Sequence, residues 1–163
     1  MTNPWMETKA ELVSQFQQQK QMADAAIGRV DEATFFAYLR QDGDDHTNSI
    51  AILVKHISGN FFSRWTDFLT RDGEKPDRER PREFVQDDRD DRSHLLERWE
   101  GAWQCLFTAL EELTEEDFAK TVYIRGEAHS VVKAILRSLV HATHHIGQID
   151  LLATALSAKT GKA

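Results

Sequence analysis

The sequence predicts an all-α protein folded as a four-helix bundle, and three observations support that prediction. Four segments of about 20 residues or more repeat apolar residues every three or four positions, the spacing that places side chains on one face of an α-helix. Most of the segments between them are polar and contain turn residues. The connection between the second and third helices is long and highly charged, so it does not force those two helices to be antiparallel neighbours.

Composition limits the functions that the chain can have. A length of 163 residues with 40% hydrophobic residues suits one domain over residues 1–163. The net charge of −7 opposes binding to nucleic acid. The arginines of residues 71–92 do not offset this charge, because acidic residues interleave with them. A single cysteine, Cys105, excludes an intrachain disulfide and a thiolate-rich zinc cluster. Without an apolar leader or a run of 18 apolar residues, we expect a soluble cytoplasmic protein that does not contact a membrane.

The first predicted helix begins at Asn3 and Pro4, which suit a helix cap and first turn, and runs to about Val30. Residues 31–47 form a connection with a short packed helical piece at residues 35–39. The second helix begins at the capping residues 47–49 and ends near Leu69. Its predicted buried residues are Ile50, Val54, Ile57, Phe61, Trp65 and Phe68.

Residues 71–92 are almost all charged or helix-breaking, so we expect no regular packed structure there. A chain of about 20 residues at about 3.3 Å each is longer than a 20-residue helix, so this connection can cross the whole bundle. The second and third helices therefore need not be antiparallel neighbours. The third helix is predicted from about Ser93 to Leu113, with an apolar stripe of Leu96, Trp99, Trp103, Leu106, Leu110 and Leu113.

A possible extended segment at residues 121–124 precedes the fourth helix, which starts after His129. Its apolar stripe consists of Ile135, Leu139, Ala142, Ile146, Ile149, Ala153 and Leu156. His141 and His145 border this stripe four residues apart, so both imidazoles face one point. This is metal-ligand spacing, although two such histidines also fit a simple polar edge of a helix.

The other histidines and polar residues define the rest of the candidate site. No glutamate follows His141, so the sequence lacks the H-E-x-x-H arrangement of a metalloprotease. His56, beside the stripe of the second helix, is the candidate third ligand. Three neutral imidazoles suit zinc or nickel and leave one coordination position open. Gln148, one turn after His145, and Asn60 are candidates for orienting a ligand or substrate, and Arg64 is a candidate for the entrance.

These motifs together resemble the DinB/YfiT-like superfamily of helical-bundle metalloenzymes. That superfamily has one histidine on its second helix and an H-x-x-x-H pair, commonly followed by Gly-Gln, on its last helix. The matching residues are His56, His141, His145, Gly147 and Gln148. More specifically the chain resembles the DUF1572 branch, through Asn48-Ser49-Ile50-Ala51, Gly59-Asn60, Arg64-Trp65-Thr66-Asp67-Phe68-Leu69, Asp72-Gly73-Glu74-Lys75 and Ile124-Arg125-Gly126-Glu127.

The resemblance implies a divalent metal ion bound by His56, His141 and His145, a bacterial cytoplasmic setting and a homodimer. Characterised members of the superfamily include S-transferases that use bacillithiol or mycothiol, and a mycothiol-dependent maleylpyruvate isomerase. We therefore expect a metal-dependent enzyme, either a thiol-dependent transferase or a hydrolase, whose small-molecule substrates include a low-molecular-weight thiol. The alternative is a non-catalytic, metal-binding, stress-associated helical bundle.

Overall fold

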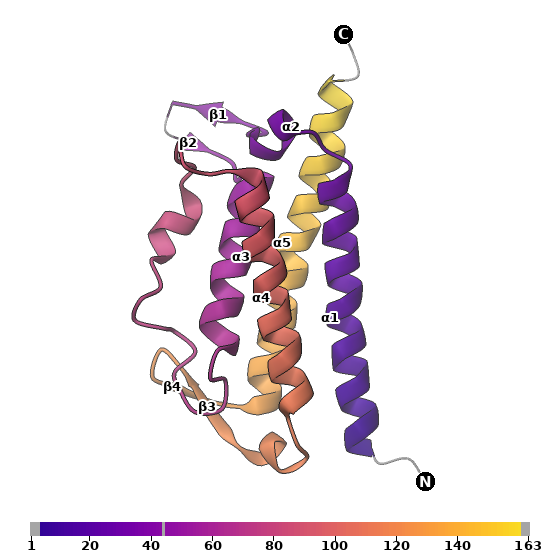
Figure 1. The fold of residues 1–163 in the computed structure, drawn as a ribbon, viewed down its shortest axis with the longest axis vertical. Coiled ribbons are helices and arrows are strands. Elements are labelled where there is room, and N and C mark those ends of the chain that lie inside the picture. Colours follow the sequence, from indigo (N-terminus) through magenta and orange to yellow (C-terminus); the bar gives the residue numbers. More distant parts are fainter. Residues whose placement is uncertain (1–3, 44, 161–163) are drawn as a thin grey trace.

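The computed structural model describes residues 4–43 and 45–160 and is mostly helical, as the apolar spacing predicts (Figure 1). Its long helices are α1 (Pro4–Gly28), α3 (Ile50–Trp65), α4 (Arg92–Glu112) and α5 (Val131–Thr160), and α2 (Glu32–Phe36) is short. Two small antiparallel hairpins pair β1 (Gln41–Asp42) with β2 (Asp45–His46) and β3 (Thr121–Ile124) with β4 (Glu127–Ser130). Short 3₁₀ helices occur at Arg80–Phe84 and Glu116–Ala119.

The long helices run up, down, down and up in chain order (Figure 1). Helix α3 packs chiefly against α4, and α1 packs chiefly against α5, so the closest pairs are parallel. The connection between α3 and α4 makes this arrangement possible because it returns the chain along the outside of the molecule. Among the described helices, none has the length together with the apolar character that a bilayer crossing needs.

The core is rich in aromatic side chains that meet edge to face. The ring centroids of Phe61 and Trp103 lie 4.8 Å apart, and those of Trp99 and Trp103 lie 5.5 Å apart. These rings are almost fully buried, so the tryptophans of α4 belong to the core. Leu95, rather than the predicted Leu96, is the first buried leucine of α4, and Leu96 is only partly buried.

Helix boundaries follow local capping. The Ser49 side chain accepts a hydrogen bond from the Ile52 amide at 3.2 Å, which fixes the start of α3. The predicted end at Leu69 is wrong by four residues, because Thr66 is extended and Asp67 has a positive φ of 51°. The cap predicted at Asn3 lies outside the described residues.

The short second helix also begins earlier than its predicted range of residues 35–39. The Asp31 carboxylate accepts a hydrogen bond from the Thr34 amide at 2.8 Å, so α2 starts at Glu32 and ends at Phe36. Ala37, with an extended backbone, follows as its C-cap. The predicted packed helical piece is therefore present, in a shifted position.

The β3–β4 hairpin is only half predicted by the sequence. The extended segment at residues 121–124 is confirmed, but its partner, residues 127–130, is a strand where the sequence predicts only a lead-in to the last helix. Arg125 and Gly126 form the turn with positive φ angles of 57° and 76°. This hairpin covers the end of the molecule at which α5 begins (Figure 1).

One carboxylate ties the hairpin to the connection that follows α3. Asp72 accepts hydrogen bonds from the backbone amides of Arg125 at 2.9 Å, Gly126 at 2.8 Å and Glu74 at 2.7 Å. The connection is consequently more ordered than its charge pattern predicts. It also contains the 3₁₀ helix at Arg80–Phe84, which packs against α3.

Candidate metal centre

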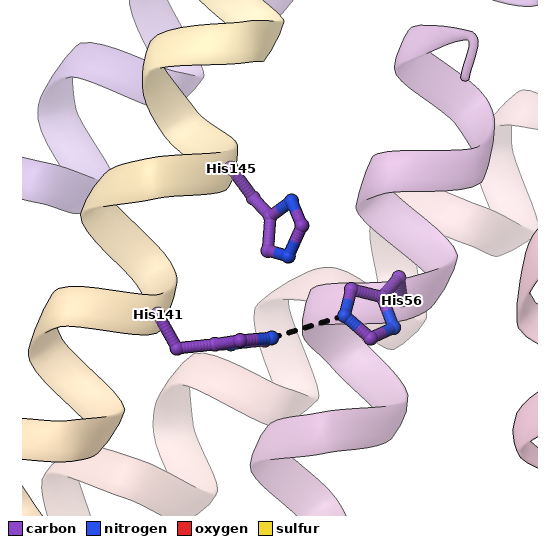
Figure 2. A group of neighbouring side chains, drawn as sticks. All are labelled: His56, His141 and His145. Atoms are coloured by element: carbon purple, nitrogen blue, oxygen red, sulfur yellow. Dashed lines mark hydrogen bonds between the residues drawn. The ribbon is translucent and has the colours of Figure 1, made fainter. Parts of the chain in front are cut away.

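Three histidines from two helices point toward one another (Figure 2). His56 comes from α3, and His141 and His145 come from successive turns of α5. One ring nitrogen of each lies within 4.8 Å of the corresponding atoms of the other two. The Nε2 atoms of His56 and His141 are only 3.0 Å apart. The packing of α3 against α5 therefore brings together the three residues that the sequence singled out.

Burial sets the protonation of this cluster. The pKa of His141 is lowered to about 3, and the largest cause is the loss of hydration on burial. Smaller contributions come from the nearby side chains of His145, His56 and Arg78. Burial also lowers the pKa of His145, and the hydrogen bond with Gln148 only partly offsets this. Both rings are neutral at pH 7, which is the form that binds a metal ion.

A buried carboxylate orients His56. The Nδ1 atom of His56 lies 2.8 Å from Glu83 Oε2, so the ring donates its proton to Glu83 and directs the Nε2 lone pair at the other histidines. Arg78 holds the same carboxylate with Nε and a terminal nitrogen at 2.7 and 2.8 Å. Burial raises the pKa of Glu83, but the hydrogen bonds from His56 and Arg78 outweigh it, so the pKa falls below its usual value.

Glu83 is absent from the sequence prediction because it lies in the charged connection, where the two residues before it, Pro81 and Arg82, are exposed. No periodicity distinguishes it from the other acidic residues there. The one signal is Gly59 on α3, since a methyl group added there would overlap the Glu83 carboxylate. Glycine at this position lets the 3₁₀ helix approach α3 closely enough for the contact with His56.

Gln148 orients the second ligand candidate of α5. Its side-chain oxygen lies 2.8 Å from His145 Nδ1, so that nitrogen donates and Nε2 remains available. His144 is exposed and lies outside the cluster. His141 Nδ1 is buried and has no hydrogen-bond partner among the described residues.

The donor set fits a zinc-like ion. In a tetrahedral site with bonds of about 2.0–2.1 Å, two ligand nitrogens lie about 3.4 Å apart. The spacing of 3.0 Å between His56 and His141 is close to that value. Two ring lone pairs repel at this distance unless a proton or a cation lies between them. Across the described chain, no further histidine, cysteine or carboxylate joins the three, so an ion held here would have three protein ligands of these kinds.

A cavity of about 150 Å³ adjoins the cluster, and His56 and His141 form part of its wall. Asn60 and Arg64, both singled out from the sequence, also line it. Arg125, in the turn between β3 and β4, lines the cavity and also pairs with Glu74. No pattern in the sequence points to the other arginines of the cavity wall, which are Arg78, Arg80 and Arg137.

The remaining histidines lie elsewhere. His129, on β4, is buried and has no hydrogen-bond partner for its ring nitrogens in the described part of the chain; its nearest carboxylate, that of Glu127, is 3.9 Å away. His46 and His94 are not in the cluster. Cys105 is half-buried, and its sulfur lies 3.6 Å from the Thr66 hydroxyl.

The fold and the site thus define a mostly helical protein with a partly buried three-histidine cluster. A family model described as "Protein of unknown function (DUF1572)" matches residues 2–162, and the chain belongs to that family. No protein with a curated description matches the chain. The family description assigns no activity, so a function has to be inferred from the chemistry of the site.

Proposed function

We propose that the protein is a metal-dependent enzyme that binds one divalent ion through His56, His141 and His145. The single observation that supports this most is the convergence of three ring nitrogens within 4.8 Å from two separate helices. Neutral imidazoles favour zinc or nickel over magnesium or calcium, which prefer oxygen ligands. His56 donates a hydrogen bond to Glu83 and His145 donates one to Gln148. Histidines that bind a metal ion usually make such a hydrogen bond with the ring nitrogen that does not face the ion.

A set of three protein ligands favours catalysis over a purely structural role. Structural zinc sites are usually closed by four protein ligands, whereas catalytic sites keep one position for water or substrate. A divalent ion in such a site lowers the pKa of a bound thiol or water and supplies a nucleophile near neutral pH. We propose a thiol-dependent S-transferase that uses a low-molecular-weight thiol, or a hydrolase if water takes that position.

The wider assignment is to the DinB-like superfamily, with a homodimer in the cytoplasm. The order of the four long helices and the histidine positions are consistent with that assignment. An exposed apolar row on α5 supports a dimer contact, because Val132, Leu136 and Val140 lie one turn apart and are 36%, 46% and 69% exposed.

A second candidate function is that of a non-catalytic, metal-binding, stress-associated protein. One observation favours it. The cluster links α3 to α5, so a bound ion would stabilise the fold without any reaction. An exchangeable water at the fourth position would support the enzyme, and a protein side chain there would support the structural role.

Metal analysis of the purified protein tests the ligand set. We expect about one zinc or nickel ion per chain in the wild type, and a loss of most of it in His141→Ala and His145→Ala. His144→Ala is the matched control, because His144 is the exposed neighbour on the same helix. Unchanged metal content in both ligand variants would remove the proposed site.

Activity requires a separate test. Low-molecular-weight thiols would be screened against electrophilic acceptors with the metal-loaded protein and with protein treated with a chelator. We expect turnover only in the loaded protein, restored when the metal is added back. Turnover that is equal without metal would contradict the proposed chemistry even if an ion binds.

A further inference from the structure

The cavity beside the histidine cluster is strongly basic. Five arginines line it, and no acidic side chain among the described residues does so. They come from four separate segments of the chain and converge on one space of about 150 Å³. These arginines are Arg64 on α3, Arg78 and Arg80 in the connection, Arg125 in the β3–β4 turn and Arg137 on α5.

Three of these arginines pair with two carboxylates that do not line the cavity. The Glu74 carboxylate accepts a hydrogen bond from Arg64 and another from Arg125, each with a nitrogen-to-oxygen distance of 3.0 Å. A terminal nitrogen of Arg78 lies 3.4 Å from the same carboxylate. Glu83 accepts two hydrogen bonds from Arg78. Two negative charges thus face three positive ones, so a positive excess remains at the cavity even where the arginines are paired.

The other two arginines have no carboxylate partner in the described chain. Arg80 lies over the Phe84 ring, 5.7 Å from its centroid, and this contact holds its guanidinium without neutralising it. Arg137 lies one turn before His141 on α5, on the same side of the helix. Both line the cavity, and both are exposed enough to take up a ligand from solvent.

Two neutral polar side chains complete the wall of the cavity. Asn60 is only 7% exposed and lines the cavity, so its side-chain amide is available to a group bound there. Ser138 adds a hydroxyl: its oxygen accepts from Trp65 Nε1 at 3.2 Å, which leaves its own proton to donate.

We propose that this basic cavity binds the anionic group, a carboxylate or a phosphate, of the substrate whose reacting end lies at the metal. The inference rests on the proposed function, since the cavity shares His56 and His141 with the metal site. Arginine pairs bind carboxylate and phosphate through two parallel hydrogen bonds. The volume equals that of about five waters, so it holds one such group, and the rest of the substrate extends toward the histidines or the solvent.

Calorimetric titration of the zinc-loaded protein tests the cavity, with inorganic phosphate in one series and malonate in another to distinguish the two anions. Acetamide is the neutral control. We expect saturable binding of at least one anion and none of acetamide. Arg80→Gln and Arg137→Gln should each weaken that binding about tenfold, which corresponds to about 1.4 kcal/mol. Arg82→Gln is the matched control, because Arg82 is an exposed arginine of the same 3₁₀ helix that does not line the cavity.

Zinc content, measured on the same samples, separates this inference from the proposed function. We expect full zinc content in all three arginine variants. Arg80→Gln and Arg137→Gln would overturn the cavity proposal alone if both variants bind zinc normally and bind the anion as tightly as the wild type. Any bound anion would then lie on the metal. If the wild type binds no zinc, the proposed function fails, and arginine-dependent anion binding by the metal-free protein would still support a basic binding cavity.

Discussion

At the scale of single residues, Glu83 shows how an unremarkable acidic residue acquires a specific role. Its carboxylate lies between His56 and Arg78, with hydrogen bonds to both of 2.7 to 2.8 Å. The contact with His56 selects the ring tautomer whose Nε2 faces the other two histidines. A neutral side chain of the same shape would keep the volume and lose the charge that strengthens this contact.

Glu83→Gln is therefore expected to weaken zinc binding by about 10- to 100-fold, the usual cost of losing an outer contact to a ligating histidine. The affinity is measured by competition with a chelator of known strength. Glu79→Gln is the control, since Glu79 precedes the same 3₁₀ helix and is exposed. Equal zinc affinities in the two variants would show that Glu83 does not support the metal site.

The protonation of His141 leads to a prediction for the metal-free protein. Its folded pKa of about 3 lies below the ordinary value of 6.5, so the unfolded chain binds this proton first as the pH falls. The stabilisation is complete above about pH 6.5 and is lost progressively toward pH 3. We expect the difference in unfolding free energy between pH 7 and pH 5 to be smaller in His141→Gln than in wild type, measured by urea unfolding with chelator present. His94→Gln, at an exposed helix start, should retain the wild-type pH dependence.

At the scale of elements, the sequence predicts what depends on local patterns. The four long helices follow from apolar spacing, and the Ser49 cap follows from capping chemistry. The position of His141 and His145 on one side of α5 follows from their spacing of four residues. The strand at residues 127–130 does not, because it is short and polar and exists through its pairing with residues 121–124. Glu83 is equally invisible in the sequence, because its environment is created by the return of the connection onto α3.

The connection and the β3–β4 hairpin behave as one unit through Asp72. Asp72→Ala removes the acceptor for three backbone amides, and we expect it to lower the free energy of unfolding by about 1–3 kcal/mol. Urea unfolding at pH 7 measures the change. Asp77→Ala, an exposed aspartate of the same connection, should leave stability within about 0.5 kcal/mol of wild type. Equal effects of the two substitutions would mean that Asp72 does not hold the hairpin.

At the scale of the whole molecule, the site lies where separate parts of the chain meet. Helices α3 and α5 supply the histidines, and the outer connection and the hairpin bring arginines to the same place. The net charge of −7 gives no hint of this concentration of arginines. Acidic residues do interleave with these arginines in sequence, but Glu74 and Glu83 pair with them without lining the cavity.

Because the histidines lie on different helices, a bound ion should link α3 to α5 and stabilise the whole fold. A ligand that binds only the native state adds about 2.7 kcal/mol at a free concentration 100 times its dissociation constant. For a chain of this size, that raises the melting temperature by about 5–10 °C. We expect this shift when zinc is added to chelator-treated wild type and to His144→Ala, measured by circular dichroism, and no shift in His141→Ala. A shift in His141→Ala as large as that of the wild type would show that zinc stabilises the protein from another site.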